Sequence, residues 1–342
     1  MKRILVFRLS AIGDVAMTVP VILSFAKTYP DAEITFVSQK FANGFLKYIP
    51  GVTLFEVDLK GRHKGFLGIF RLYFDLKKLG RFDIVADLHD VIRTKIIRFL
   101  FGFSSAKVVV LDKGRKEKKN LCKNEGKFFR PLESTTTRYA KVLQDAGFDF
   151  NVEFDYLFTK SPLNEKTLSI TGIKEGKWIG VAPFAKHKGK IYPLELMEKV
   201  MTLLTNAKGL KVFLFGGGSF EKEILEGWEK RFPNTISLAG KLSIEDELKV
   251  ISNLNVLVSM DSANMHFASL VNTSVISIWG ATHPYAGFYG WNQNPRNAIQ
   301  VDLSCRPCSI YGNKPCFRKD YACLYRITPE SIVSKIQEEI IA

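Results

Sequence analysis

The chain has 342 residues, enough for two domains of ordinary size, and 46% of them are hydrophobic, as in a globular protein. Its net charge of +15 is unevenly placed, because Lys and Arg outnumber Asp and Glu by 19 to 8 between Asp58 and Arg130. This excess predicts an anionic partner, but the stretch has no motif typical of nucleic-acid binding. The opening apolar run, residues 4–7, is too short for a signal peptide or a membrane span, which predicts a cytoplasmic protein.

The first half of the chain alternates apolar strands with amphipathic helices. A strand over residues 2–9 is followed by a polar turn at 10–14 and by a helix over 15–28. The later elements are strands at 34–37, 52–57, 83–88 and 108–111 and a helix at 66–79. This alternation predicts a doubly wound α/β domain built on a parallel sheet.

The pattern breaks after Phe158 and then restarts, which predicts domains at 1–160 and 161–342. The strands of the second half are predicted at 178–183, 211–215, 236–239, 256–260 and 274–279, and a last helix at 330–340. We therefore expect two doubly wound, Rossmann-like domains that face each other across a cleft. Such an arrangement offers one crevice to each of two substrates.

The stretch from Asn255 to Leu270 combines a buried strand with the start of a helix. Asp261 and Ser262 follow the strand and are residue types that cap helices. A helix N-terminus at the carboxyl end of a parallel strand presents backbone N–H groups and a positive dipole end to the ligand crevice. The segment predicts a site for an anion such as pyrophosphate, and capping alone is the alternative.

Four motifs, in this order, resemble the heptosyltransferase family of bacterial lipopolysaccharide synthesis, glycosyltransferase family 9. They are ILVFRLSAIGDVAMTVP, KGKIYP, FGGG and VSMDSANMHFASL, and the resemblance runs from Met1 to about Pro329. It implies a GT-B fold and an inverting transfer of heptose from ADP-heptose, held by the C-terminal domain, to a phosphorylated glycolipid held by the N-terminal domain. It implies no catalytic metal or other cofactor. In such folds the terminal helix is expected to pack back on the first domain.

The resemblance implies catalytic roles for two residues. Asp14, in the SxxGD turn, matches the general base for the acceptor hydroxyl. Lys190 matches the lysine whose ammonium offsets the charge on the departing diphosphate. Taken alone, Asp14 fits a helix N-cap equally well, and Lys186 and Lys188 are alternatives to Lys190.

The resemblance also implies a donor-binding set in three segments. The glycine turn allows a nucleotide to approach the backbone closely, and Leu242 with Ser243 corresponds to a turn that lines an adenine. The third segment matches the family's DTGxxH-like motif, although this sequence has Ser262-Ala263 where Thr-Gly is common. The donor-binding residues implied are Gly216, Gly217, Gly218, Leu242, Asp261, Ser262, Ala263, Asn264 and His266.

On the acceptor side, the implied residues are Gly13 and His89. For His89, simple packing is the alternative interpretation. The basic run from Arg115 to Lys127 is expected to dock the enzyme on the anionic cytoplasmic face of the inner membrane. The alternatives to heptosyl transfer are another donor sugar, a GT-B nucleotide-sugar epimerase, and a non-catalytic phosphate- or polysaccharide-binding protein.

Four of the five cysteines lie close together in the sequence, at Cys305, Cys308, Cys316 and Cys323. Four thiolates can hold a structural zinc ion, but the second CxxC pair of a zinc ribbon is absent. Disulfides are not expected in a cytoplasmic protein of this size. The spacing leaves two interpretations, a zinc site and a group of free thiols.

Overall fold

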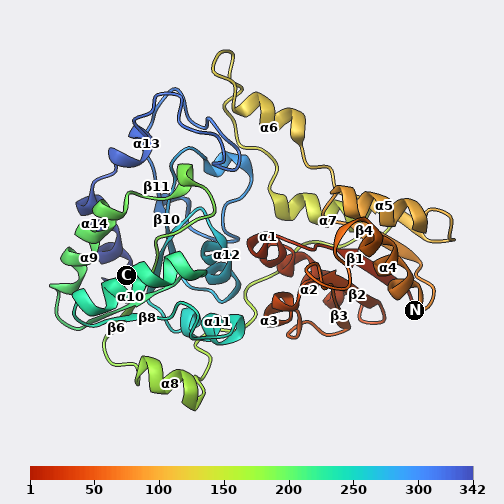
Figure 1. Cartoon of the computed structure of the whole chain (residues 1–342), viewed down its shortest axis with the longest axis horizontal. Helices are drawn as coiled ribbons and strands as arrows, with labels where there is room; N and C mark the ends of the chain where they lie inside the picture. Colours follow the sequence, from red (N-terminus) through yellow and green to blue (C-terminus); the bar gives the residue numbers. More distant parts are fainter. Residues whose placement is uncertain (342) are drawn as a thin grey trace. The chain divides into compact units, whose positions relative to one another are not determined.

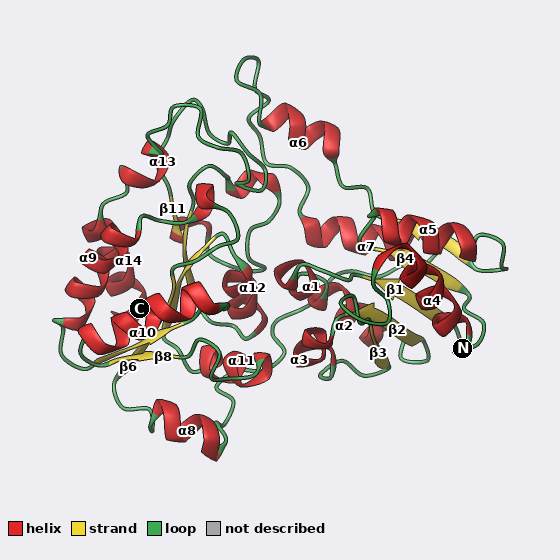
Figure 2. Ribbon diagram, in the orientation of Figure 1, coloured by secondary structure: helices red, strands yellow, loops and turns green. Residues whose placement is uncertain are grey.

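The computed structural model describes residues 1–341, which fall into two compact units (Figure 1). Unit 1 contains residues 1–113 and 133–154, and unit 2 contains residues 114–132 and the chain from Asp155 onward. Figure 2 shows that helices flank the strands in each unit. No helix within the described residues combines the length and the apolar character needed to cross a bilayer.

Unit 1 is built on a five-stranded parallel sheet in the order β3-β2-β1-β4-β5. The first strand is central because its Ile4, Leu5 and Val6 are fully buried, as both faces of a doubly wound sheet require. The strands are β1 (Arg3–Phe7), β2 (Glu33–Ser38), β3 (Val52–Glu56), β4 (Ile84–Asp87) and β5 (Lys107–Val110). The helices are α1 (Ile12–Ala16), α2 (Val19–Thr28), α3 (Asn43–Leu46), α4 (Gly65–Lys77), α5 (Ile92–Phe101) and α7 (Thr135–Asp145), with a 3-10 turn η1 (Lys40–Ala42).

Helices α4 and α5 pack against each other and against the same face of this sheet. Their inward side chains join residues of β1, β2 and β4 in one apolar core. The core includes Leu5, Phe7, Val37, Ile69, Leu72, Leu76, Val85, Ile97 and Phe101. Spacings of three and four residues put these side chains of α4 and α5 on one side of each helix.

The helix predicted over residues 15–28 is two helices, so this prediction was wrong in detail. The first, α1, begins already at Ile12, and α2 begins at Val19 with Pro20 in its first turn. Proline has no N–H to donate and its ring clashes with the preceding turn, so it is tolerated only where a helix starts. The break leaves α1 as a short helix that carries Asp14 at its third position.

Unit 2 is built on a six-stranded parallel sheet in the order β11-β10-β9-β6-β7-β8. Its strands are β6 (Lys177–Ala182), β7 (Leu210–Leu214), β8 (Thr235–Ser237), β9 (Val256–Met260), β10 (Val275–Ile278) and β11 (Ala298–Ile299). Its helices are α6 (Arg115–Leu121), α8 (Glu165–Thr171), α9 (Leu194–Thr205), α10 (Ser219–Arg231), α11 (Ile244–Ser252), α12 (Ala263–Leu270), α13 (Ala322–Tyr325) and α14 (Pro329–Ile341). Short 3-10 turns are η2 (Lys188–Lys190), η3 (Pro284–Ala286) and η4 (Pro295–Asn297).

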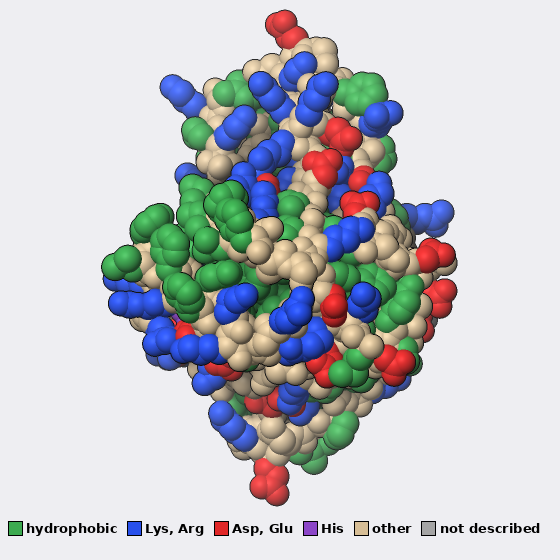
Figure 3. Space-filling view, turned by 90° about the vertical axis from the view of Figure 1, so that its right-hand side faces the viewer, with side chains coloured by type: hydrophobic (Ala, Val, Ile, Leu, Met, Phe, Trp, Pro, Cys, Tyr) green, Lys and Arg blue, Asp and Glu red, His purple; other side chains and the backbone are tan. Residues whose placement is uncertain are grey.

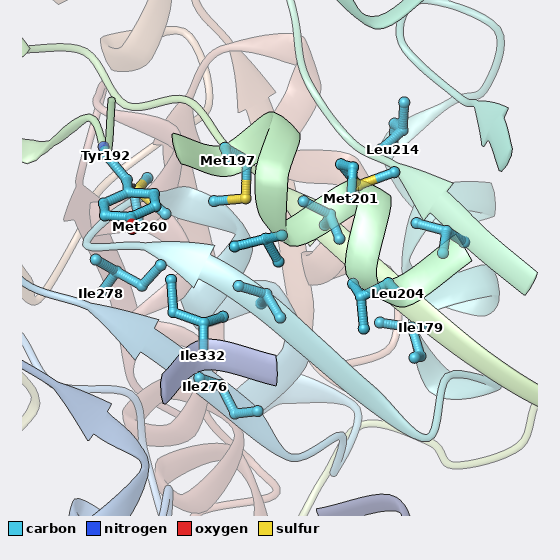
Figure 4. Close-up of a cluster of buried hydrophobic side chains, with 14 of the residues drawn as sticks. Ile179, Tyr192, Met197, Met201, Leu204, Leu214, Met260, Ile276, Ile278 and Ile332 are labelled. Carbon is cyan, nitrogen blue, oxygen red and sulfur yellow. Dashed lines mark hydrogen bonds between the residues drawn. The ribbon is translucent and has the colours of Figure 1, made fainter. Parts of the chain in front are cut away.

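The terminal helix α14 completes the core of unit 2. It packs on α9 and on β9 and β10, and its Ile332 and Ile336 are fully buried. Figure 4 shows Ile332 among the side chains of β9, β10 and α9, beside Ile276. The buried face of α14 is thus occupied by the sheet of unit 2 and by α9. Packing of this helix on the first domain, expected from the sequence, stays a prediction.

The basic segment 114–132 belongs to unit 2, although the predicted boundary at residue 160 grouped it with the first domain. Lys127 Nζ donates to three carbonyl oxygens, those of Ser304, Arg306 and Pro307, at 2.7–3.3 Å. Lys118 is buried, with Nζ 4.6 Å from the centre of the Phe288 ring. Part of the charge run is therefore used inside the unit, which a count of lysines does not reveal.

If α14 supports the core of unit 2, Ile332→Ala should lower the free energy of unfolding by about 2 to 5 kcal/mol, through lost burial and the cavity left behind. Urea unfolding followed by circular dichroism measures this change. Gln337→Ala, at an exposed position of the same helix, is the matched control and should shift the free energy by less than about 0.5 kcal/mol. Equal effects of the two changes would contradict a core role for α14.

Candidate functional site

In unit 2, the ends of two neighbouring strands bring Lys190 and Asp261 together. Lys190 lies in the turn that follows β6, and Asp261 directly follows β9. Lys190 Nζ is 2.8 Å from Asp261 Oδ2, and the side chains are only 15% and 4% exposed. By contrast, Lys186 and Lys188 are exposed, and Lys188 Nζ lies over the Tyr321 ring. Of the three lysines considered from the sequence, Lys190 is the one that meets the carboxylate.

The Lys190–Asp261 contact leaves bonding capacity on both partners. Asp261 Oδ2 is buried, and within the described residues no donor reaches it in hydrogen-bond geometry, so the contact with Lys190 is an ion pair only. An ammonium has three N–H donors, and a carboxylate has several lone pairs. The pair can therefore donate to a phosphate oxygen and accept from a hydroxyl.

Close backbone packing holds the turn that carries Lys190. Ala281 N donates to Gly189 O at 2.8 Å, and this links the turn after β6 to the loop after β10. A Cβ on Gly280 would lie 2.6 Å from Gly189 O, so only glycine fits there. Tyr192, two residues after Lys190, is fully buried and donates its hydroxyl to Ile327 O at 2.7 Å. These contacts leave Lys190 little freedom to move.

The N-terminus of α12 lies next to this pair. Ser262 is at the N-cap position, but its side chain makes no capping bond, and its hydroxyl is 3.2 Å from Ser259 Oγ. Asp261 faces Lys190, so neither Asp261 nor Ser262 caps α12 with its side chain. Ala263 and Asn264 are half-buried in the first turn of α12, and His266 is buried further along it. The first turn thus offers N–H groups that neither of these side chains caps.

The glycine turn follows β7, at the same edge of the sheet. Gly217 N donates to Glu221 Oε2 at 2.7 Å. Gly218 has a φ of 82°, a backbone conformation that residues other than glycine rarely adopt. Nothing lies within 4 Å of where a Cβ on Gly217 or Gly218 would stand, so this backbone borders open space. Burial raises the pKa of Glu221. Sequence analysis missed Glu221, although an acidic residue in the first turn of a helix after a glycine turn is a visible signal.

The turn after β8 holds Leu242 and Ser243. Ser243 caps α11, because its Oγ accepts from Asp246 N at 3.2 Å and donates to Asp246 Oδ2 at 2.7 Å. Leu242 is half-exposed beside it. Leu242 therefore lies at the carboxyl-end edge of the sheet, and its role in lining an adenine stays a prediction.

In unit 1, Asp14 is paired with a buried arginine at the carboxyl end of β1. Arg8 Nη2 lies 2.5 Å from Asp14 Oδ2, and Arg8 Nη1 donates to Leu88 O at 2.9 Å. Asp14 Oδ2 also accepts from Ala11 N at 3.2 Å, so the carboxylate supports the helix start from position three and is not the N-cap. Gly13 precedes it inside α1. Arg8 was not among the site residues predicted from the sequence.

His89 follows β4 and lies in the same group of charges. Its Nδ1 accepts a long hydrogen bond from Leu9 N, at 3.4 Å. Burial, together with the positive charges of Arg8 and Lys113, lowers the pKa of His89 to about 3, although Asp14 and Asp90 act in the opposite direction. His89 is thus a neutral imidazole near Asp14, so unit 1 brings two of the residues named from the sequence together.

All five cysteines are free thiols. Within residues 1–341, no three His, Cys, Asp or Glu side chains are grouped so that they could hold a metal ion. Burial raises the pKa of the Cys323 thiol to about 11 and also raises that of Cys308. Arg306, between the cysteines, is buried and donates to carbonyl oxygens of Trp279, Gly280, Thr282 and Val301. The cysteine-rich loop therefore holds the backbone after β10 in place.

Comparison with known proteins identifies the family. Residues 73–316, more than half of the chain, match the model of glycosyltransferase family 9 (heptosyltransferase). The chain belongs to this family. Lipopolysaccharide heptosyltransferase 1 of Campylobacter coli is 28% identical over 98% of each chain. This family 9 chain is thus similar over almost all of its length to a protein of that name.

Solved structures agree with the fold. A family 9 glycosyltransferase from Veillonella parvula has a TM-score of 0.75, with 21% identity, and the match covers 99% of this chain and 97% of that one. The Escherichia coli ADP-heptose lipopolysaccharide heptosyltransferase II has a TM-score of 0.70, with 18% identity, over 100% and 99%. The expected GT-B fold of two doubly wound α/β domains is confirmed.

The low pKa of His89 predicts a pH dependence of stability. The unfolded chain binds a proton at His89 near pH 6.5, whereas the folded chain stays neutral there until about pH 3. Its contribution to stability is therefore complete above pH 6.5 and falls as the pH falls below that value. Between pH 6.5 and 5 the loss should be about 2 kcal/mol.

His89→Gln should remove this part of the loss. Urea unfolding of both proteins at pH 7 and pH 5 checks it, because other titrating groups contribute equally to both. If the two proteins lost the same free energy on acidification, His89 would not be the buried neutral group described.

Proposed function

We propose that this family 9 glycosyltransferase transfers a heptose from ADP-heptose to a lipopolysaccharide core or related phosphorylated glycolipid, with inversion at the anomeric carbon. The Lys190–Asp261 pair beside the first turn of α12 is the observation that carries the proposal. A diphosphate is bound by cations and N–H donors, and a sugar hydroxyl donates to an acceptor such as a carboxylate. Both kinds of group lie together at this site. The family membership and the name of the Escherichia coli relative favour ADP-heptose as donor.

In this mechanism the residues of unit 2 bind and polarise the donor. The Lys190 ammonium and the N–H groups at the start of α12 offset the charge that grows on the departing diphosphate, so no metal is needed for this role. The open backbone at Gly217 and Gly218 and the half-exposed Leu242 take the nucleoside. Asp261 accepts a hydrogen bond from a sugar hydroxyl.

The acceptor hydroxyl is activated in unit 1. Asp14 is the general base, and Arg8 fixes its orientation by the contact at Oδ2. Inversion requires the hydroxyl to attack the face opposite the leaving diphosphate, so base and leaving group belong to opposite sides of the sugar. His89 and Gly13 contact the acceptor. The acceptor is a lipid-linked sugar, so the enzyme works in peripheral contact with the cytoplasmic face of the inner membrane.

The donor site is tested with calorimetric titrations of ADP, UDP and GDP. ADP should bind selectively, and Lys190→Gln should weaken its binding on the order of 10- to 100-fold, the effect of losing charge-assisted hydrogen bonds. Glutamine can still donate to Asp261, which limits damage to the fold. Lys188→Gln, at an exposed lysine of the same turn, is the matched control and should bind ADP normally. A preference for UDP or GDP would contradict the proposed donor.

Asp14→Asn separates catalysis from binding. A base acts in the transition state, so turnover of ADP-heptose with acceptor should fall by about 10²- to 10⁴-fold while the dissociation constant of ADP stays within about twofold. Turnover is followed by release of ADP that depends on added acceptor, which also distinguishes a transferase from an epimerase. Asp31→Asn, at an exposed position of unit 1, is the control. Unchanged turnover in Asp14→Asn would exclude Asp14 as the base.

A further inference from the structure

Helices α4 and α5 of unit 1 carry large apolar side chains on the side turned away from their sheet. Their exposed fractions range from 60% to 78%. We call these residues the α4–α5 patch: Phe66, Leu67, Phe74, Ile92, Phe99 and, just after the end of α5, Phe103. Figure 3 shows hydrophobic side chains gathered on the face turned to the viewer, with Lys and Arg side chains at their border.

The patch is a second apolar stripe on helices that already bury a first one. The inner stripe, with Ile69, Leu72 and Ile97 among its members, fills the core of unit 1. The outer positions of α4, residues 66, 70 and 74, repeat every four residues, so they form a continuous row along the helix. Ring contacts order this surface, with centroids 5.3 Å apart for Phe66 and Phe70 and 5.1 Å apart for Phe99 and Phe103. A helix that is apolar on both sides indicates a missing partner.

The charges around the patch indicate the kind of partner. Helices α4 and α5 contain one carboxylate, Asp75, and five basic residues: Arg71, Lys77, Arg93, Lys95 and Arg98. Asp75 is engaged by Arg62, at 2.6 Å, and by His63, and these contacts hold its pKa well below the usual range. Arg93 and Arg98 are half-buried and donate within unit 1, to His63 O and to the carboxylates of Asp87 and Asp90, and Lys95 Nζ is 3.6 Å from Asp90 Oδ1. The positive charge at the surface of these helices therefore rests mainly on the exposed Arg71 and Lys77. A second copy of the same surface would bring like charges together in a symmetric contact.

We propose that the α4–α5 patch docks this protein on an anionic lipid bilayer. The phenylalanine and leucine side chains enter the boundary between headgroups and acyl chains, and the Lys and Arg side chains meet lipid phosphates. This surface differs from the basic run expected from the sequence, because Lys118 and Lys127 of that run are turned into unit 2. The proposal deepens the proposed function, on which its purpose rests, since a lipid-linked acceptor is presented at such a surface.

Vesicle flotation tests the docking without donor or acceptor, so its result does not depend on heptosyl transfer. The wild-type protein should float with vesicles of phosphatidylcholine containing about 30% phosphatidylglycerol and much less with phosphatidylcholine alone. Phe66→Ser combined with Phe99→Ser should reduce the bound fraction about tenfold or more. Ile173→Ser combined with Phe317→Ser is the matched control, because these side chains are 76% and 60% exposed on unit 2. The control should bind like the wild type.

Two further measurements keep the test decisive. Arg71→Gln combined with Lys77→Gln should weaken binding to the anionic vesicles and reduce its dependence on salt. Circular dichroism of each variant should match the wild type, since the changed side chains are exposed. If the wild type bound no vesicles, or the double serine variant of the patch bound normally, the proposal would be overturned.

Flotation of a variant of the basic run, together with the oligomeric state of the protein without lipid, tests the two alternative explanations of the patch. Loss of binding in Lys116→Gln, Lys119→Gln and Lys123→Gln combined, with normal binding of the patch variant, would move docking to the basic run and overturn the proposal. So would a wild-type dimer that the patch variant converts to a monomer without lipid, because a second copy would then cover the patch. Vesicle binding by a protein that does not use ADP-heptose would leave the docking intact and refute the proposed function instead.

Discussion

The Lys190–Asp261 ion pair is the contact on which the arrangement of unit 2 depends. Strands β6 and β9 are hydrogen-bonded neighbours, and their register sets Ala182 beside Ser259, so both chains leave the sheet at the same level. A buried carboxylate without a partner is costly, and so is a buried ammonium. Each residue therefore makes the burial of the other possible. The absence of a side chain at Gly189 and Gly280 lets this turn lie close to the loop after β10.

In unit 1, the charged residues after β1 and β4 are linked to one another and to the backbone. Asp87 is fully buried, pairs with Arg98 at 2.8 Å and accepts from the backbone N–H groups of His89 and Asp90. This fixes the loop after β4, and with it the position of His89. Arg8 connects that loop to α1, since it reaches both Leu88 O and Asp14. Asp14 and His89 therefore belong to one connected group of hydrogen bonds and ion pairs, in which Arg8 orients the Asp14 carboxylate.

The strands were the most predictable part of the fold. Buried parallel strands are continuous apolar runs, and each of the ten predicted strands lies within about two residues of one in the structure. The two-residue β11 was missed because Ala298–Ile299 is too short to show a pattern. Helix ends were less predictable where one residue decides them, as with Pro20. The unit to which a segment belongs was not predictable from the pattern, as residues 114–132 illustrate.

For the candidate site, motif order carried most of the information. It named Asp14, Lys190 and Asp261, and two of these meet in the structure. It did not name Arg8 or Glu221, because their importance lies in contacts between residues that the sequence separates or leaves unmarked. Spacing also suggested a zinc site for the cysteines. It says nothing about whether thiols converge, and that depends on how the loop around Arg306 folds.

The membership of residues 114–132 in unit 2 has a consequence for synthesis of the chain. The polypeptide passes from one unit to the other at three points, after Lys113, after Leu132 and after Phe154. During translation this segment emerges long before His283 and Tyr285, against which Phe129 packs. Residues 133–154, which complete unit 1, are therefore synthesised while the partners of residues 114–132 in unit 2 do not yet exist. The two units are not separate stretches of chain, and no single cut divides the polypeptide into two complete units.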